Sequence, residues 1–138
     1  MYRINSLRAL ADHLDREGSL ALAEVENVQF TKNLPPSFAS GTFLNCAFVP
    51  GGTMPEDLVG TVFIGCRMSG LFFTNANLFG ARFIRCDLRN VYFRGCDMAA
   101  TEFEDCAIDA ITVRYCDLDG SSLDNLPVEP DIACDKAA

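Results

Sequence analysis

The sequence has little of what catalysis, metal binding or membrane insertion requires. Its 138 residues include a single histidine, His13, and no C-x-x-C motif. No phosphate-binding loop or catalytic motif is present, and no run of 18 apolar residues could span a membrane. Charged residues recur through the first 18 positions, which leaves no apolar signal-peptide core. We therefore expect a cytoplasmic protein that is not an enzyme, holds no cofactor or metal and enters no membrane.

Charge is unevenly distributed along the chain, whose net charge is −8. Residues 61–100 carry +3, from five arginines and two aspartates, whereas residues 101–138 carry −8, from ten acidic and two basic side chains. An acidic end of this kind repels nucleic acid and attracts basic protein surfaces. We therefore expect a protein partner and no direct binding of nucleic acid. An acidic end that serves only solubility explains the same charge equally well.

Cysteine is frequent, but its spacing excludes the usual zinc motifs. Zinc sites draw their ligands from short paired motifs, and six of the seven cysteines stand ten or twenty residues apart. We expect these six thiols to lie inside the fold as small apolar groups, and Cys134 to be the exposed one. The six are Cys46, Cys66, Cys86, Cys96, Cys106 and Cys116.

A five-residue period runs from Phe43 to Leu123. Sixteen of the seventeen residues at this spacing are large and apolar, and Thr53 is the exception. No helix or simple strand has this period. Two residues before each of these centres, from position 61 to 121, stands a small or aliphatic residue without charge. Because residues two apart in an extended segment point to the same side, both positions face inward and the residue between them faces solvent.

The corners and the cross-section follow from the same pattern. Two residues after most centres stands a glycine or asparagine, which tolerates the left-handed backbone of tight turns. Similar side chains recur every twenty residues, as Phe43, Phe63, Phe83 and Phe103 do. Twenty residues per coil therefore predict four corners and a square β-solenoid over residues 41–125. The eight predicted corner residues are Gly65, Gly70, Asn75, Gly80, Asn90, Gly95, Gly120 and Asn125.

Residues 1–40 precede the repeat, and we expect them to form a helical cap on the open end of the solenoid. Ser6 can begin a helix and Gly18 can end it. The apolar residues of this helix are expected to share one face, with His13 on the polar side: Leu7, Leu10, Ala11 and Leu14. Two prolines and two glycines at 50–57 predict a loop that bulges without loss of register. Residues 126–138 are expected to form an acidic tail.

The repeat resembles that of the pentapeptide-repeat family. Its pattern, a small residue followed by Asp or Asn and then Leu, Phe or Met, stands at 76–80, 86–90, 96–100 and 116–120. The resemblance implies an all-β solenoid, a right-handed quadrilateral β-helix with a short N-terminal helical cap. It also implies a binding function, because some family members look like DNA and bind DNA gyrase. A small acidic member with a helical cap is further similar to phage anti-CRISPR proteins that act on type I surveillance complexes.

The first hypothesis for function is DNA mimicry by a monomer that occupies the basic DNA-binding surface of a bacterial nucleic-acid-processing complex. A type I CRISPR-Cas surveillance complex is favoured slightly over gyrase, because dimeric gyrase-binding members carry an apolar C-terminal element that this acidic, proline-containing tail does not match. Proteins that bind duplex DNA line their channels with Lys and Arg, so a rigid acidic rod can fill such a channel. The candidate partner-binding residues are Asp57, Asp97, Glu102, Glu104, Asp105, Asp109, Asp117, Asp119 and Asp124.

The second hypothesis is a generic protein-interaction module or scaffold. It would use four aromatic residues at outward or corner positions, a residue type that interface hot spots favour: Phe72, Phe79, Tyr92 and Tyr115. Ionic strength distinguishes the two hypotheses, because salt weakens charge mimicry more than an aromatic interface. The loop at 50–57 remains an alternative contact.

Overall fold

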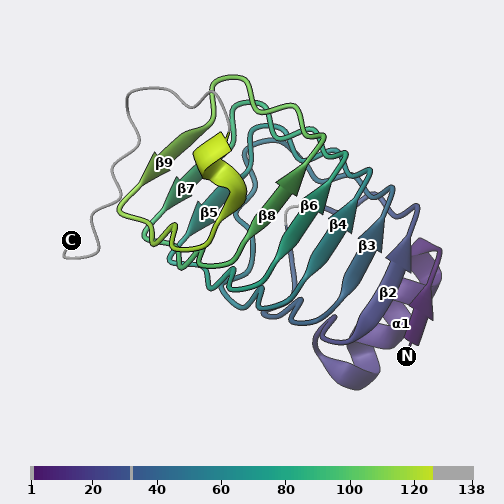
Figure 1. Ribbon diagram of the computed structural model, residues 1–138. Coiled ribbons are helices and arrows are strands. Elements are labelled where there is room, and N and C mark those ends of the chain that lie inside the picture. Colours follow the sequence, from purple (N-terminus) through teal and green to yellow (C-terminus); the bar gives the residue numbers. More distant parts are fainter. Residues whose placement is uncertain (1, 32, 126–138) are drawn as a thin grey trace.

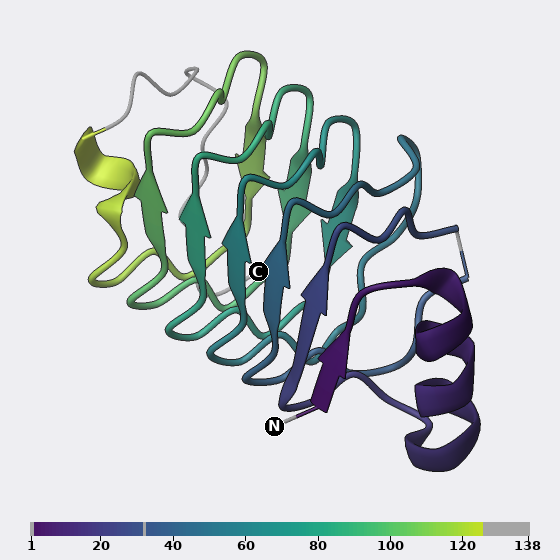
Figure 2. The same cartoon turned by 90° about the vertical axis from the view of Figure 1, so that its right-hand side faces the viewer.

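The computed structural model describes residues 2–31 and 33–125, and it is a β-solenoid of about six turns with one short N-terminal helix (Figure 1). The predicted all-β solenoid is therefore confirmed. Its helix α1 and strand β1 lie at one end of the rod and its 3-10 helix η1 at the other (Figure 2). The elements are β1 (Tyr2–Ile4), α1 (Leu7–Glu17), β2 (Ala23–Glu26), β3 (Thr42–Leu44), β4 (Val62–Ile64), β5 (Phe72–Thr74), β6 (Arg82–Ile84), β7 (Tyr92–Arg94), β8 (Glu102–Glu104), β9 (Thr112–Arg114) and η1 (Ser122–Asn125).

Two parallel sheets and two ladders of single bridges form the four sides of the coil. One sheet has six strands in the order β1-β2-β3-β4-β6-β8, and the other has three in the order β5-β7-β9. From β3 onward the strands pair at intervals of twenty residues, so that Phe43 lies beside Phe63 and Phe63 beside Phe83. The third and fourth sides are joined by bridges such as Arg67 to Asp87 and Asp97 to Asp117.

Stacked phenylalanines fill the interior at the predicted centres. Phe43, Phe63, Phe83 and Phe103 form one column with ring centroids 5.2, 5.2 and 5.0 Å apart. The first three of these rings have no exposure to solvent. Each three-residue strand from β3 to β9 buries only its central residue, because the two flanking side chains point outward. The large apolar centres therefore form the core that the five-residue period predicts.

Cysteine and threonine occupy seven of the thirteen predicted small inward positions from 61 to 121, and all of the seven except Cys116 donate a hydrogen bond to a carbonyl of the preceding coil. The thiols of Cys66 and Cys86 donate to the carbonyls of Phe43 and Phe63, each at 3.3 Å, and the Thr61 hydroxyl donates to Phe38 O at 2.9 Å. Five of the six predicted thiols are buried and Cys106 is half-buried. Contacts with neighbouring thiols, together with burial, raise the pKa values of Cys66, Cys96 and Cys106. These thiols are structural groups, while Cys134 lies outside the described residues.

The corners adopt the left-handed backbone that the sequence predicts. Seven of the eight predicted Gly or Asn corners have positive φ, and Asn125 lies instead in η1. At Gly65 glycine is needed for space as well, because an added Cβ would lie 2.5 Å from Asn45 Oδ1. Other corners with positive φ are occupied by larger residues, including Arg85 and Tyr115, so their residue types did not reveal them as corners.

The segment 50–57 shifts its register within one side of the coil. Thr53 bridges Phe72, nineteen residues on, whereas Asp57 bridges Asn77 at the regular interval of twenty. Met54 is buried in place of Thr53, with 2% of its surface exposed, which explains the one polar residue in the five-residue series. The backbone stays bonded to the next coil through Gly51 N to Gly70 O and Met54 N to Phe72 O, at 2.9 and 2.8 Å. The expected bulge is therefore replaced by a local change of register.

Helix α1 has the predicted ends but a different buried face. Ser6 Oγ accepts a hydrogen bond from Ala9 N, and Gly18 closes the helix with φ of 72°. His13, predicted on the polar side, is buried with 2% exposure, whereas Leu7 is 62% exposed and Ala11 is exposed. The predicted face was therefore wrong for Leu7, Ala11 and His13, whereas Leu10 and Leu14 pack against the core as predicted. Pairing of β1 with β2 just before the helix begins sets how the helix docks. In addition to the buried His13, three residues of the helix pack against the core: Ala9, Leu10 and Leu14.

Residues 20–40, which the sequence analysis grouped with the cap, form a coil of the solenoid. Val25 in β2 pairs with Phe43, eighteen residues on, so this coil is two residues shorter than those that follow. Its Leu20 and Phe38 have no exposure, and the Phe30 ring stacks on Phe48 with centroids 4.8 Å apart. The solenoid therefore extends upstream of residue 41. The five-residue period did not reveal this coil, because its shorter length puts it out of phase with the later ones.

Candidate protein-interaction surface

One side of the rod carries negative charge without any basic residue. We call residues 35–38, 55–58, 75–78, 95–98 and 115–118 the acidic face. They include four acidic residues and neither lysine nor arginine. A continuous ladder of bridges aligns the outward positions of the five coils, which are Ser37, Asp57, Asn77, Asp97 and Asp117. Glu56, Asp57 and Asp97 are exposed and Asp117 is half-buried. The structure thus aligns three of the predicted site residues in one column.

The column residues also stabilise the turns that follow them. Asp97 Oδ1 accepts a hydrogen bond from Ala99 N, and Asp117 Oδ1 accepts one from Asp119 N, each at 3.0 Å. Asn77 Oδ1 makes the same bond to Phe79 N at 3.1 Å without any charge. Such bonds are typical of Asp and Asn in turns. The carboxylates of Asp97 and Asp117 are therefore oriented by the backbone, and asparagine preserves the turn while removing the charge. Asp57 is held differently, because its Oδ2 accepts a hydrogen bond from the Ser37 hydroxyl at 3.0 Å.

A second acidic group lies on the adjacent side, at the C-terminal end of the six-stranded sheet. Glu102 and Glu104 are the outward residues of β8, and Asp105 follows at the corner with positive φ. Glu102 is paired with Arg82 of β6, with Nε and Oε2 2.9 Å apart. Both partners are exposed, so the pair contributes little to stability, but it reduces the field of Glu102.

The remaining predicted site residues are placed differently. Asp119 is exposed and follows the acidic face at the next corner, whereas Asp109 lies beyond the opposite side of the coil, where its carbonyl accepts from Asn90 N at 2.9 Å. Asp124 belongs to η1, and its side chain is outside the described part. Sequence proximity grouped Asp109 with Asp105, but one corner separates them.

The side that carries Asp87 has mixed charge. Arg89 binds Asp87 through two nitrogen–oxygen contacts of 2.8 Å. This hydrogen-bonded partner lowers the pKa of the Asp87 carboxyl. The negative potential is therefore concentrated on the acidic face and on β8.

The four outward aromatic residues do not form one patch. Phe72 and Tyr92 lie in register on β5 and β7, with ring centroids 6.0 Å apart, and the guanidinium of Arg94 lies 5.5 Å from the ring centre of Tyr115. Phe79 is separate, at the corner after the acidic face, and 52% of its surface is exposed. Phe79 and Tyr115 are therefore the aromatic residues near the acidic column. Phe79 adjoins the acidic face, and Tyr115 belongs to it and lines an open hollow with Asp97 and Asp117.

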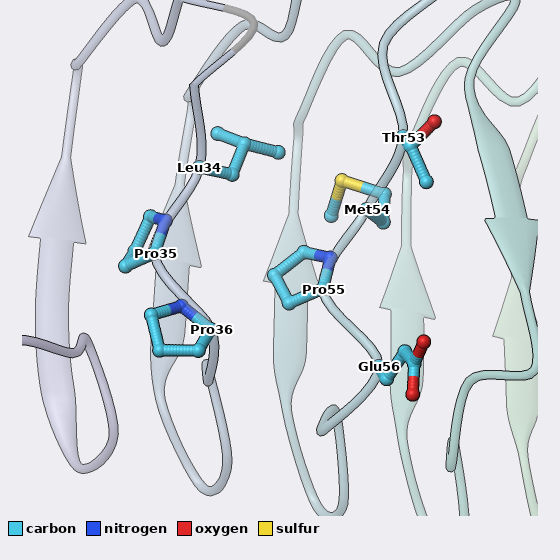
Figure 3. A pocket seen from close by; sticks show the side chains of 7 residues that line it. All are labelled: Leu34, Pro35, Pro36, Thr53, Met54, Pro55 and Glu56. Carbon is cyan, nitrogen blue, oxygen red and sulfur yellow. The ribbon is translucent and has the colours of Figure 1, made fainter.

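An open apolar pocket borders the other margin of the acidic face, where two successive coils present prolines (Figure 3). Glu56 lines its rim, so that it opens beside the acidic column. The other lining residues are Leu34, Pro35, Pro36, Thr53, Met54 and Pro55. Among residues 2–31 and 33–125 no group of His, Cys, Asp and Glu side chains could hold a metal ion, and no helix there is long and apolar enough to cross a membrane.

A four-sided parallel β-helix with twenty residues per coil and a small inward residue two positions before each large one defines the class of the protein. The family model for pentapeptide repeats matches in eight copies over residues 57–95 and 76–109. Over residues 57–109 the chain matches the pentapeptide-repeat family, as the sequence pattern predicted.

A solved structure of low sequence identity shares the fold. QnrB1, described as a plasmid-mediated fluoroquinolone resistance protein, is 17% identical, with a TM-score of 0.50 over 88% of this chain and 72% of that one. The pentapeptide repeat protein Rfr23 from the cyanobacterium Cyanothece 51142 is 12% identical, with a TM-score of 0.39 over 80% of this chain and 95% of that one. No curated protein matches the sequence. Similarity at this level establishes the fold alone.

Proposed function

We propose that this protein is a non-enzymatic cytoplasmic inhibitor that acts as a monomer and places its acidic face on the DNA-binding surface of a bacterial nucleic-acid-processing complex. The observation that carries the proposal is the column of Asp57, Asp97 and Asp117 on a side without lysine or arginine. Duplex DNA also presents regularly spaced negative charge along a rigid rod, and proteins that bind it do so through Lys and Arg.

The rigidity of the column makes it suitable for this role. Neighbouring coils are about 4.8 Å apart, so Asp97 and Asp117 stand one rung apart and Asp57 two rungs from Asp97. Their positions are set by the bridges and turn bonds described above, so binding requires little ordering of side chains. Complementary charge also speeds association with a basic surface. A preorganised acidic column therefore supports competition with DNA.

Two targets follow from the pentapeptide-repeat pattern and the fold. A type I CRISPR-Cas surveillance complex is the first, because small acidic repeat proteins with a helical cap resemble anti-CRISPR proteins. DNA gyrase is the second, because some family members bind it, and a fluoroquinolone resistance protein shares the fold. The tail at 126–138, which argued against a gyrase-binding dimer, lies outside the described residues.

Displacement of DNA tests the proposal directly. Each purified target is bound to fluorescent duplex DNA, and the protein is titrated in at low and at high ionic strength. We expect it to displace the DNA from one target, and the double variant Asp97→Asn, Asp117→Asn to require a higher concentration. Asn77 shows that asparagine keeps the turn bond, so the variant should keep its thermal midpoint. Equal displacement by the double variant and the wild type would refute charge mimicry.

A scaffold role remains the second candidate, and the exposed aromatic residues favour it. Phe72 is 44% exposed and Tyr115 is 39% exposed, and neither is needed for charge mimicry. Binding through these residues predicts an affinity that changes little with salt and falls on substitution of Phe72. Binding through the acidic face predicts an affinity that falls as salt is raised and does not change on substitution of Phe72.

A further inference from the structure

A ridge runs along the corner of the rod that precedes β2, β3, β4, β6 and β8 (lower edge of the sheet in Figure 1). Its first five rungs are uncharged, and Asp119 stands at the sixth, where its carbonyl accepts from Ala100 N at 2.8 Å. We define this corner ridge as residues 21–22, 39–40, 59–60, 79–80 and 99–100. Backbone bonds align these pairs: each second residue donates to the carbonyl of the first residue in the next coil, as Gly60 N does to Phe79 O at 2.9 Å. The ten residues are Ala, Ser, Gly, Val, Leu and Phe.

Two large side chains project from this ridge. Leu22 is 60% exposed and Phe79 is 52% exposed. The other ridge residues show that neither side chain is needed by the corner: Ser40 and Gly60 occupy the position of Leu22 in later coils, and Ala99 occupies that of Phe79. Three coils separate the rungs of Leu22 and Phe79, which places the two side chains about 14 Å apart.

Leu22 is also held in a backbone conformation that leucine rarely adopts. Its φ is 63°, in the left-handed region where an L side chain costs about 1–2 kcal/mol relative to glycine. Glycine stands at this corner in three later coils, as Gly60, Gly80 and Gly120. An exposed, strained leucine does not stabilise the corner. Ser40 and Ala100 also have positive φ at this corner, so the conformation belongs to the corner, and among the ridge residues only Leu22 combines it with a large apolar side chain.

The position of the ridge identifies the kind of partner. The acidic face lies on one side of it, and the sheet that carries Glu24, Glu26, Glu102 and Glu104 lies on the other. Protein interfaces combine apolar anchors with a charged rim. Here the rim is negative on the side of the acidic face, whereas on the sheet Glu24 and Glu102 are paired with Arg3 and Arg82. A partner must therefore present apolar sites within a basic surface. DNA itself offers no side chains of this kind, so the ridge adds recognition that charge mimicry lacks.

We infer that the corner ridge is an apolar docking strip, in which Leu22 and Phe79 enter two apolar sites on the same basic partner that the acidic face binds. The inference rests on the proposed function, because it assigns the partner to the DNA-binding surface. It deepens that function by predicting two contributions to affinity. The acidic face contributes a part that salt weakens, and the ridge contributes a part that salt does not.

Binding curves of single variants test the inference, with DNA gyrase and a type I surveillance complex as the probes. Phe79→Ala copies Ala99 and Leu22→Gly copies Gly60, so both variants should fold. Phe72→Ala is the matched control, because it removes another exposed phenylalanine from a different side of the rod. We expect each ridge variant to weaken binding by about tenfold or more, as loss of an interface anchor does. The factor by which each variant weakens binding should be the same at low and at high salt. Phe72→Ala should leave the affinity unchanged.

The outcomes separate this inference from the proposed function. Unchanged affinity of both ridge variants, with weaker binding by Asp97→Asn, Asp117→Asn, would overturn the ridge and retain the charge mimic. The opposite result would overturn the charge mimic and retain the ridge as the docking surface. Equal losses for Phe72→Ala and Phe79→Ala would overturn a specific role for the ridge. Binding of the wild type to neither probe would overturn both proposals.

Discussion

Replacement of Phe83 by alanine should break the interior column at its middle. Its side chain has no exposure, and its ring stacks on Phe63 at 5.2 Å and on Phe103 at 5.0 Å, with Phe73 edge-on at 6.1 Å. Loss of a buried phenylalanine costs about 3–5 kcal/mol through lost burial and the cavity that remains. Phe93 is a fourth aromatic neighbour, also edge-on, at 6.5 Å. Four aromatic contacts leave little room for collapse, so we expect about 4–5 kcal/mol.

Urea denaturation followed by circular dichroism measures this loss through the midpoint and its slope. Phe103→Ala is the control, because Phe103 belongs to the same column but lies near its C-terminal end with 8% exposure. One neighbouring coil is missing there, so its loss should be smaller, about 3 kcal/mol. A cost for Phe83→Ala below about 1 kcal/mol, or below that of Phe103→Ala, would refute the description of the core as a packed column.

Three further predictions concern a corner, the thiols and one ion pair. Gly65→Ala should destabilise the fold by more than Gly80→Ala, because a Cβ at Gly65 meets Asn45 Oδ1 and one at Gly80 meets nothing within 4 Å. Gly80→Ala should cost only about 1–2 kcal/mol, the cost of an L side chain in the left-handed backbone. The urea midpoints of the two variants check this difference. The five buried thiols should react with Ellman's reagent only on unfolding, and rapid labelling of the native protein at these positions would contradict their interior placement. Because Arg89 lowers the pKa of Asp87 in the folded state, the stability from this pair is present above the unfolded pKa and lost as pH falls through the folded one. Midpoints measured from pH 5 downward should therefore decline less for Asp87→Asn than for the wild type.

The regular part of the fold was predictable because its physical cause is local and repeats. A core centre every five residues and a similar residue every twenty were enough to place Phe63, Cys66 and Gly65 in their roles. The prediction failed where side-chain packing, and not residue spacing, determines which residue enters the core. Met54 replaces Thr53 in the core because one side of the coil changes register. Strands β2 and β3 pair at an interval of eighteen residues, so the five-residue period no longer marks the first coil.

The candidate site was predictable to the same extent. Asp57, Asp97 and Asp117 were aligned from their spacing alone, because a solenoid brings residues twenty apart into one column. Asp109 does not join this column, because the corners distribute neighbouring residues over different sides. The buried face of α1 also could not be read from its sequence, since pairing of β1 with β2 sets how the helix docks. The signal that reveals the ridge is the repeated absence of charge at one corner.

The solenoid allows its outer surface to vary without disturbing its interior, because inward and outward residues alternate within each strand. The column aspartates are partial exceptions, since their carboxylates serve the turn as well as the surface. Lysine at these positions would remove both the turn bond and the negative charge, and a loss of binding would then have two explanations. Asparagine separates them, because Asn77 already performs the turn role in the same column. Leu22 and Phe79 serve the surface alone, as the small residues in equivalent positions show. A comparison of asparagine variants in the column with ridge variants can therefore assign affinity to charge or to apolar contact without a change in the core.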